Sequence, residues 1–106
     1  MSIMKSTTTG AAAIATTITP TAASAIDSMM LHLSAAGGAG NLTVTIDAIA
    51  GAAYDTVLLT QDMTAVTDLY WQPDRPIELD SGDKIVVAWA NAGGKTYGLT
   101  VNWLGR

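Results

Sequence analysis

The 106-residue sequence contains no cysteine, which excludes disulfides, catalytic thiols and thiolate-bound metals together. It contains one histidine, His32, so sites that need several histidine ligands are excluded as well. Small domains that lack disulfides and metals often gain stability by oligomerising. We therefore expect a single small domain that contacts other chains.

Charge is also scarce in this sequence. Charged residues make up 13% of the chain, roughly half of the usual share, whereas 49% of the residues are apolar. The net charge is −4, and the basic residues are scattered along the chain at Lys5, Arg75, Lys84, Lys95 and Arg106. Scattered bases on an acidic chain argue against nucleic-acid binding. The outside either consists of small neutral residues or is partly covered by other chains, and we favour the second interpretation.

Residues 6–26, between Lys5 and Asp27, contain no charged residue and are mainly threonine and alanine. A secretory signal is a weak interpretation, because Thr16 and Thr17 interrupt its apolar middle. A membrane span is excluded, because the segment contains seven threonines together with Gly10 and Pro20. Threonine and isoleucine favour extended backbone, and proline cannot continue a helix. We expect residues 1–27 to form an extended N-terminal arm that lies on its own domain or on a neighbouring subunit.

Beyond this segment, apolar residues recur with a period of two, which is typical of half-buried strands. Leu42, Val44 and Ile46, for example, alternate with polar residues. The same reasoning predicts strands at residues 28–34, 42–47, 54–60, 68–72, 84–90 and 97–104. The strand at 84–90 is apolar on both faces, so it is either a covered central strand or a strand at a subunit contact.

The connections between these strands are rich in turn residues. Residues 34–41 contain three glycines and predict a flexible loop, which lacks the lysine and the following helix of a phosphate-binding loop. Residues 80–83 and 91–94 are glycine-containing turns of a length that joins antiparallel neighbours. Short strands, tight turns and the lack of a helical period predict an all-β fold, an antiparallel β-sandwich or barrel over residues 28–106.

The sequence offers few candidates for catalysis or metal binding. His32 lies within a predicted strand with no acid beside it, so we expect a packed or exposed histidine rather than a general base. The acidic residues show no spacing that favours a carboxylate pair. Asp80 and Asp83 suggest calcium, but the repeated order of a calcium loop is missing and a β-turn explains the segment. We expect no enzymatic activity, no cofactor and no metal.

The segment from Tyr70 to Pro76 combines aromatic side chains with two prolines. Pro73 and Pro76 stiffen the backbone and remove hydrogen-bond donors, so this segment is not a central strand. Two interpretations remain open. Either Trp71 and Arg75 form a contact surface for a sugar or a protein, or Trp71 ends a strand in the core while the prolines turn the chain.

Several short stretches resemble small virion proteins of tailed bacteriophages. They are Gly51-Ala-Ala-Tyr54-Asp55, Val57-Leu58-Leu59, Trp71-Gln72-Pro73-Asp74, Gly82-Asp83-Lys84-Ile85, Tyr97-Gly98-Leu99 and Trp103. The resemblance spans residues 26–103, about three quarters of the chain. It implies a jelly-roll-like β-sandwich and a structural role as a head decoration (cement) protein or a small tail component. It brings no ligand or catalytic residue with it.

Such a decoration protein implies a capsid protein as its partner, a homo-oligomer such as a trimer, and a location on the virion, without nucleic acid or membrane. The arm and one apolar flank would mediate assembly. The candidate partner-interface residues are Ile3, Ile14, Ile18, Trp71, Pro73 and Arg75.

The alternative function is a carbohydrate-binding or receptor-recognising module of a phage tail. It requires an exposed aromatic platform, for which the candidates are Tyr54, Tyr70, Trp71, Trp89, Tyr97 and Trp103. The alternation places Tyr97 and Trp103 on a core face, which weakens this interpretation. Joint exposure of Tyr70 and Trp71 would favour it.

Overall fold

A computed structural model describes residues 3–105; residues 1–2, the start of the expected arm, and residue 106 lie outside the described part. The described residues form nine strands and one short 3-10 helix. In chain order these elements are β1 (Ile3–Gly10), β2 (Ile14–Ile18), β3 (Ser24–Leu33), β4 (Asn41–Asp47), η1 (Ala52–Tyr54), β5 (Thr56–Asp62), β6 (Asp68–Trp71), β7 (Ile77–Leu79), β8 (Lys84–Trp89) and β9 (Tyr97–Gly105).

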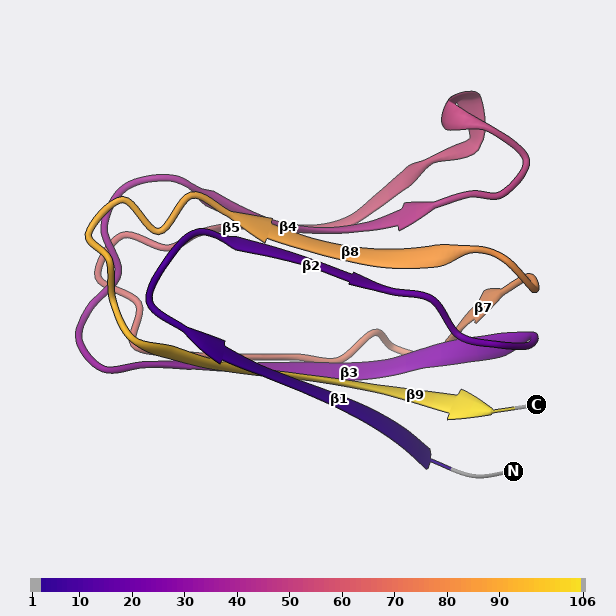
Figure 1. Ribbon diagram of the computed structural model, residues 1–106, viewed down its shortest axis with the longest axis horizontal. Helices are drawn as coiled ribbons and strands as arrows, with labels where there is room; N and C mark the ends of the chain where they lie inside the picture. The colour runs from indigo at the N-terminus through magenta and orange to yellow at the C-terminus, as the bar shows by residue number, and fades with distance from the viewer. Residues whose placement is uncertain (1–2, 106) are drawn as a thin grey trace.

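The strands lie in two antiparallel sheets that face each other (Figure 1). One sheet has the order β1-β9-β3-β6, and β7 pairs with the first residues of β3. The other sheet has the order β2-β8-β4-β5. The prediction of an all-β, sandwich-like fold with antiparallel strands is confirmed.

The core lies between the two sheets and follows the alternation in the sequence. Leu42 and Val44 of β4 are buried, as are Leu99 and Val101 of β9. The buried apolar cluster consists of Ile14, Ile18, Ile26, Met29, Leu31, Leu33, Leu42, Val44, Met63, Leu79, Ile85, Val87, Trp89, Tyr97, Leu99 and Val101. Full burial of one such side chain contributes about 1.5–3 kcal/mol, so this cluster supplies most of the favourable free energy of folding.

The six strands predicted from the sequence correspond to β3, β4, β5, β6, β8 and β9, with ends that differ by a few residues. β8, which is apolar on both faces, lies between β2 and β4 and is a central strand. Its residues Ile85 and Val87 are buried in the core, whereas Val86 and Ala88 on the outer face are half-buried. The short strand β7 has no counterpart among the predicted strands.

The N-terminal segment, expected to be an extended arm, pairs closely with the rest of the chain. Its backbone is extended, but β1 pairs with β9 along its whole length and β2 pairs with β8, so both strands belong to the sheets of the same chain. β3 begins at Ser24, inside the segment assigned to the arm. The described residues of this segment thus lie on their own domain, one of the two locations expected for the arm, and the division into an arm at 1–27 and a domain at 28–106 stays a prediction. Backbone pairing with β8 and β9 holds this threonine-rich segment in the sheets, so the segment needs few large apolar side chains to stay in place.

The glycine-rich segment at residues 34–41, predicted to be a flexible loop, is tied by backbone hydrogen bonds to the connection between β5 and β6. The Gly37 N–H donates to the Val66 carbonyl at 2.8 Å, and the Ala65 N–H donates to the Gly37 carbonyl at 3.0 Å. A Cβ at Gly37 would lie 2.4 Å from the carbonyl oxygen of Met63, so only glycine permits this close approach of two backbones. The β3–β4 and β5–β6 connections are thereby joined.

Candidate functional site

The three isoleucines predicted to contact a partner lie in two different environments. Ile14 and Ile18 of β2 are 2% and 7% exposed and belong to the core, so their side chains are not available to a partner. The prediction overlooked that residues four apart in a strand share a face, here the inner one. Ile3 of β1 is 72% exposed and lies at the surface.

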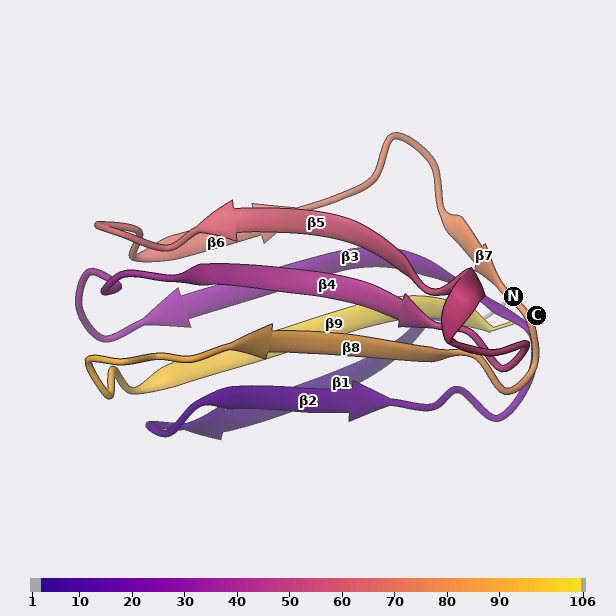
Figure 2. The same ribbon diagram turned by 90° about the horizontal axis from the view of Figure 1, so that it is seen from above.

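Strands β1 and β2 are the terminal strands of their sheets and lie along the same side of the molecule (Figure 2). We call these two strands the N-terminal edge. Alternate backbone N–H and C=O groups of a terminal strand point away from its neighbour and are free to pair with another strand. Lys5 is the one charged residue in β1 and β2. Proteins commonly place charges or prolines on exposed edges to prevent such pairing, and this edge has little of that protection.

The opposite side of the molecule is better protected. There the terminal strands are β5, which ends with Asp62, and β6, which begins with Asp68. Pro73 follows β6 and cannot donate a backbone hydrogen bond. Acidic side chains and proline make this side a poorer template for an added strand than the N-terminal edge.

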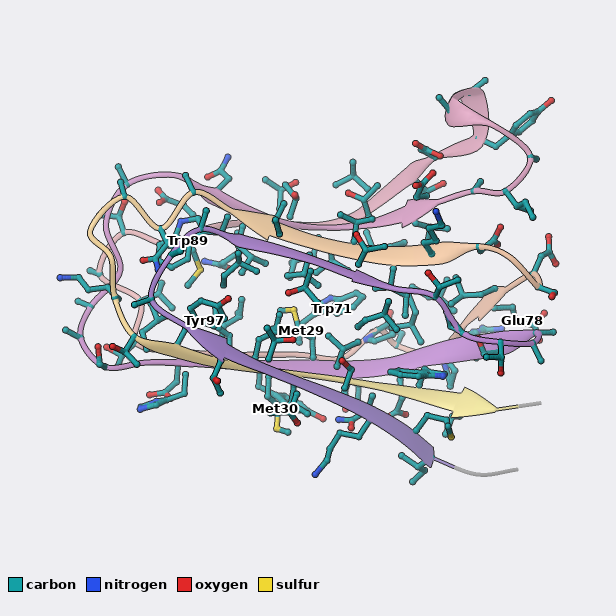
Figure 3. The ribbon with its side chains drawn as sticks, in the orientation of Figure 1. Met29, Met30, Trp71, Glu78, Trp89 and Tyr97 are labelled. Carbon is teal, nitrogen blue, oxygen red and sulfur yellow. The ribbon has the colours of Figure 1, made fainter. Side chains whose placement is uncertain are left out.

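The other three predicted interface residues lie at the end of β6 and beyond it. Trp71 pairs with Met29, and both side chains lie between the sheets (Figure 3), so Trp71 packs against the core. Pro73 is half-buried and Arg75 is exposed in the loop that leads to β7. Strands β9 and β3 separate this loop from Ile3 within the sheet, so the structure does not bring the six predicted residues into one surface.

A hollow of about 470 Å³ lies on the outer face of the β1-β9-β3-β6 sheet. Two rows of residues across three strands surround it. One row is Gly98, His32 and Asp68, and the other is Thr100, Met30 and Tyr70. Met30 is 44% exposed and Tyr70 is 61% exposed, so both side chains offer apolar surface to solvent in the hollow. Figure 3 shows Met30 on the outside of its sheet and Met29 on the inside.

His32 and Asp68 form a side-chain pair at the rim of this hollow. The distance between His32 Nδ1 and Asp68 Oδ1 is 2.5 Å, and both side chains are exposed. A hydrolytic triad would also need a hydroxyl nucleophile on the second ring nitrogen. In residues 3–105 no hydroxyl group is hydrogen-bonded to His32. The hydrogen bond to Asp68 therefore fixes the orientation of the imidazole at the rim of the hollow.

The connection between β4 and β5 rises away from the sheets (Figure 1). Ile49 and Tyr54 of this connection and Val57 near the start of β5 are all exposed apolar or aromatic side chains. Two carboxylates hold the connection: Asp83 accepts from the Ile49 N–H at 3.0 Å, and Asp55 accepts from the Ala48 N–H at 2.9 Å. We call Ile49, Tyr54 and Val57 the hairpin tip; it is an apolar surface held in place by hydrogen bonds.

The turn at residues 80–83, considered for calcium, has a structural role. The buried carboxylate of Asp83 accepts hydrogen bonds from the backbone N–H groups of Ile49 and Asp80, so both oxygens are occupied. Gly82 adopts a φ of 96°, as this tight turn requires. Within residues 3–105, no three histidine or acidic side chains gather in a way that would hold a metal ion.

The predicted aromatic platform is not assembled. Tyr70 is exposed, but Trp71 points to the opposite side of the strand and packs on the core. Trp89 and Tyr97 are buried, and Trp103 packs against the core. Tyr54 is exposed but lies at the hairpin tip, so Tyr70 is the aromatic residue that borders the hollow.

No family model matches the chain, and no curated protein is significantly similar to it. One solved structure to which it is similar comes from Bacillus endospore appendages, described as a novel family of disulfide-linked pili. That similarity covers 98% of this chain and 89% of the other, at 14% sequence identity and a TM-score of 0.35. Among the described residues, no helix has the length and apolar character that a transmembrane helix needs.

Proposed function

We propose that this chain is a non-enzymatic structural subunit of a bacteriophage virion that decorates the capsid by binding capsid protein. The observation that carries the proposal is the N-terminal edge. An unpaired and nearly uncharged edge is the kind of surface to which an extended segment of a neighbouring chain adds as a further strand. The resemblance across residues 26–103 supports the assignment to phage.

We further propose that the sandwich is a jelly roll. β1 pairs with β9, β2 with β8, β3 with β6 and β4 with β5, so the paired strands follow one another from the chain ends toward its middle. Folding these pairs into two layers gives the orders β1-β9-β3-β6 and β2-β8-β4-β5. Jelly rolls of eight strands occur in viral capsid and lectin domains, which supports a virion role.

A homo-oligomer, with a trimer favoured by the resemblance, is part of the same proposal. The small size of the domain and its lack of disulfides favour stabilisation by association. The hairpin tip offers exposed apolar surface for such contacts, because Ile49, Tyr54 and Val57 lie outside the core. The proposed location is the outside of the virion.

The experiment that tests the proposal measures binding to phage particles assembled without this chain. Purified protein is added, and the copies bound to each particle are counted by sedimentation and quantitative mass spectrometry. Wild-type protein should bind to saturation. The variant Thr7→Lys/Thr17→Lys, with one new charge on each strand of the N-terminal edge, should bind at least about tenfold more weakly, which corresponds to the loss of one or two backbone hydrogen bonds.

The matched control is Thr56→Lys/Thr60→Lys, which adds the same charge to exposed threonines of β5 on the opposite side. It should bind like wild type. Failure of wild-type protein to bind any particle would refute the virion role. Equal weakening by both double variants would instead show that added charge, rather than the N-terminal edge, controls binding.

A further inference from the structure

We infer that the hollow on the outer face of the β1-β9-β3-β6 sheet is a binding site for one ring of a neutral saccharide. This inference does not depend on the virion role, because it uses a different surface of the molecule. The hollow is bordered by Met30, His32, Asp68, Tyr70, Gly98 and Thr100.

The shape of the hollow follows from a glycine in a central strand. Gly98 of β9 lies between Thr9 and His32 in the sheet, and a Cβ placed on it would meet no atom within 4 Å. Its φ is not in the left-handed region, so the backbone does not require glycine here. The missing side chain opens the sheet surface between taller side chains. Neighbouring strands lie about 4.8 Å apart, so the three strands span about 10 Å, which is enough for one sugar ring.

The chemistry of the hollow matches the two sides of a sugar ring. Tyr70 presents an exposed aromatic ring whose hydroxyl donates a hydrogen bond to Gln72 Oε1 at 3.3 Å, and Met30 extends this apolar surface. The C–H face of a pyranose can pack on such a surface, since aromatic side chains supply large apolar contact area with a polar edge.

The polar groups lie beside this apolar surface rather than within it. Asp68 Oδ1 is taken by His32 Nδ1, whereas in residues 3–105 Asp68 Oδ2 and His32 Nε2 have no hydrogen-bond partner. A few placed polar groups beside apolar contact area are typical of small-molecule sites. Asp68 Oδ2 would accept from a sugar hydroxyl, and the second imidazole nitrogen and the Thr100 hydroxyl would supply further hydrogen bonds.

Charge selects a neutral saccharide over an acidic one. Among residues 3–105, no lysine or arginine lines the hollow; Asp68 is at its rim, and the chain carries a net charge of −4. Sialic acid, uronic acids and phosphorylated sugars would therefore be repelled. Two adjacent side chains, one histidine and one aspartate, are too few ligands for a metal ion.

The test is an NMR titration of ¹⁵N-labelled protein with methyl glucoside, methyl galactoside, N-acetylglucosamine and, as the acidic probe, sialic acid. A neutral probe should shift the amide signals of His32, Gly98 and Thr100. Tyr70→Ala should weaken binding at least about tenfold, and Gly98→Val, which fills the hollow, should abolish it. Tyr54→Ala removes an equally exposed tyrosine at the hairpin tip and should bind like wild type.

Each outcome decides the inference. Shifts confined to the hollow and lost in both hollow variants support it. Binding of sialic acid alone, shifts at the hairpin tip, or no shift with any of the three neutral probes would overturn it. The amide spectrum of each variant shows whether the fold is kept, and Tyr70→Ala, a surface substitution, provides the answer if Gly98→Val misfolds.

Discussion

Asn91, in the connection between β8 and β9, allows the contribution of one buried side chain to stability to be measured. It is 4% exposed and has a φ of 49°, in the left-handed region. Its Nδ2 group donates to the Ala12 carbonyl at 2.9 Å and to the Lys95 carbonyl at 2.9 Å, and its Oδ1 accepts from the Lys95 N–H at 3.0 Å. The side chain thus joins the β8–β9 connection to the β1–β2 turn.

Two substitutions separate the hydrogen bonds from the backbone conformation. Asn91→Gly removes the hydrogen bonds of the side chain, which contribute about 1 kcal/mol each, so we expect a loss of about 3 kcal/mol. Asn91→Ala removes the same bonds but, unlike glycine, keeps a Cβ at a left-handed position, where it lacks the local hydrogen bonds of asparagine. It should therefore be about 1 kcal/mol less stable than the glycine variant, after the lower entropy of unfolded alanine is included. At about 4 °C per kcal/mol, the glycine variant should melt about 12 °C lower.

The assay is equilibrium unfolding in urea, with the midpoint and slope fitted for each protein. Asn41→Ala is the matched control, because Asn41 is exposed at the start of β4 and its change should stay within about 0.5 kcal/mol. If the free energy of unfolding of Asn91→Gly lies within about 1 kcal/mol of the wild-type value, the buried hydrogen bonds contribute far less than about 1 kcal/mol each. If the alanine variant is as stable as the glycine variant, the left-handed backbone does not constrain this position.

Three further predictions follow from single positions. Gly98→Val should raise the free energy of unfolding in urea by about 1 kcal/mol, because valine favours a strand and meets open space. Gly37→Ala should lower it by about 2 kcal/mol, because its Cβ would collide with the Met63 carbonyl. The backbone N–H and then the hydroxyl of Thr64 hold the pKa of Asp62 below its ordinary value of 3.8. The ionised Asp62 carboxylate therefore stabilises the fold above the unfolded pKa, and this stabilisation is lost as the pH falls through the folded pKa. A ¹³C NMR titration of Asp62 should show a midpoint below 3.8. Thr64→Ala should raise this midpoint only in part, because the backbone hydrogen bond remains.

The sequence predicts well those strands in which large apolar side chains alternate. Residues 42–47 appear as β4 with Leu42 and Val44 inward, and residues 97–104 appear as most of β9. The alternation is weaker in β1 and β2, where threonine, alanine, serine and glycine occupy most positions and Ile14 and Ile18 are four residues apart. Backbone pairing, rather than apolar burial of each second residue, places these two strands, and pairing leaves no local pattern in the sequence.

The hollow was not predicted because it depends on register. His32 meets Asp68, and Met30 meets Tyr70, across two strands that are far apart in the sequence. Nothing local specifies which residues of two antiparallel strands face each other. A different signal was present, however: neighbouring residues of a strand point to opposite faces, so Tyr70 and Trp71 in one strand could not form a joint platform.

The two proposed roles use different parts of the same sheet and are compatible. A strand added at the N-terminal edge would pair with backbone groups of β1 and extend the sheet sideways. The hollow lies on the outer face of β9, β3 and β6, and its side chains stand roughly perpendicular to that extension. A subunit bound through its edge therefore keeps this face open, whereas a subunit bound through its face would cover Tyr70 and Met30. Protection of Tyr70 from surface labelling on an intact particle would accordingly favour binding through the face over binding through the edge.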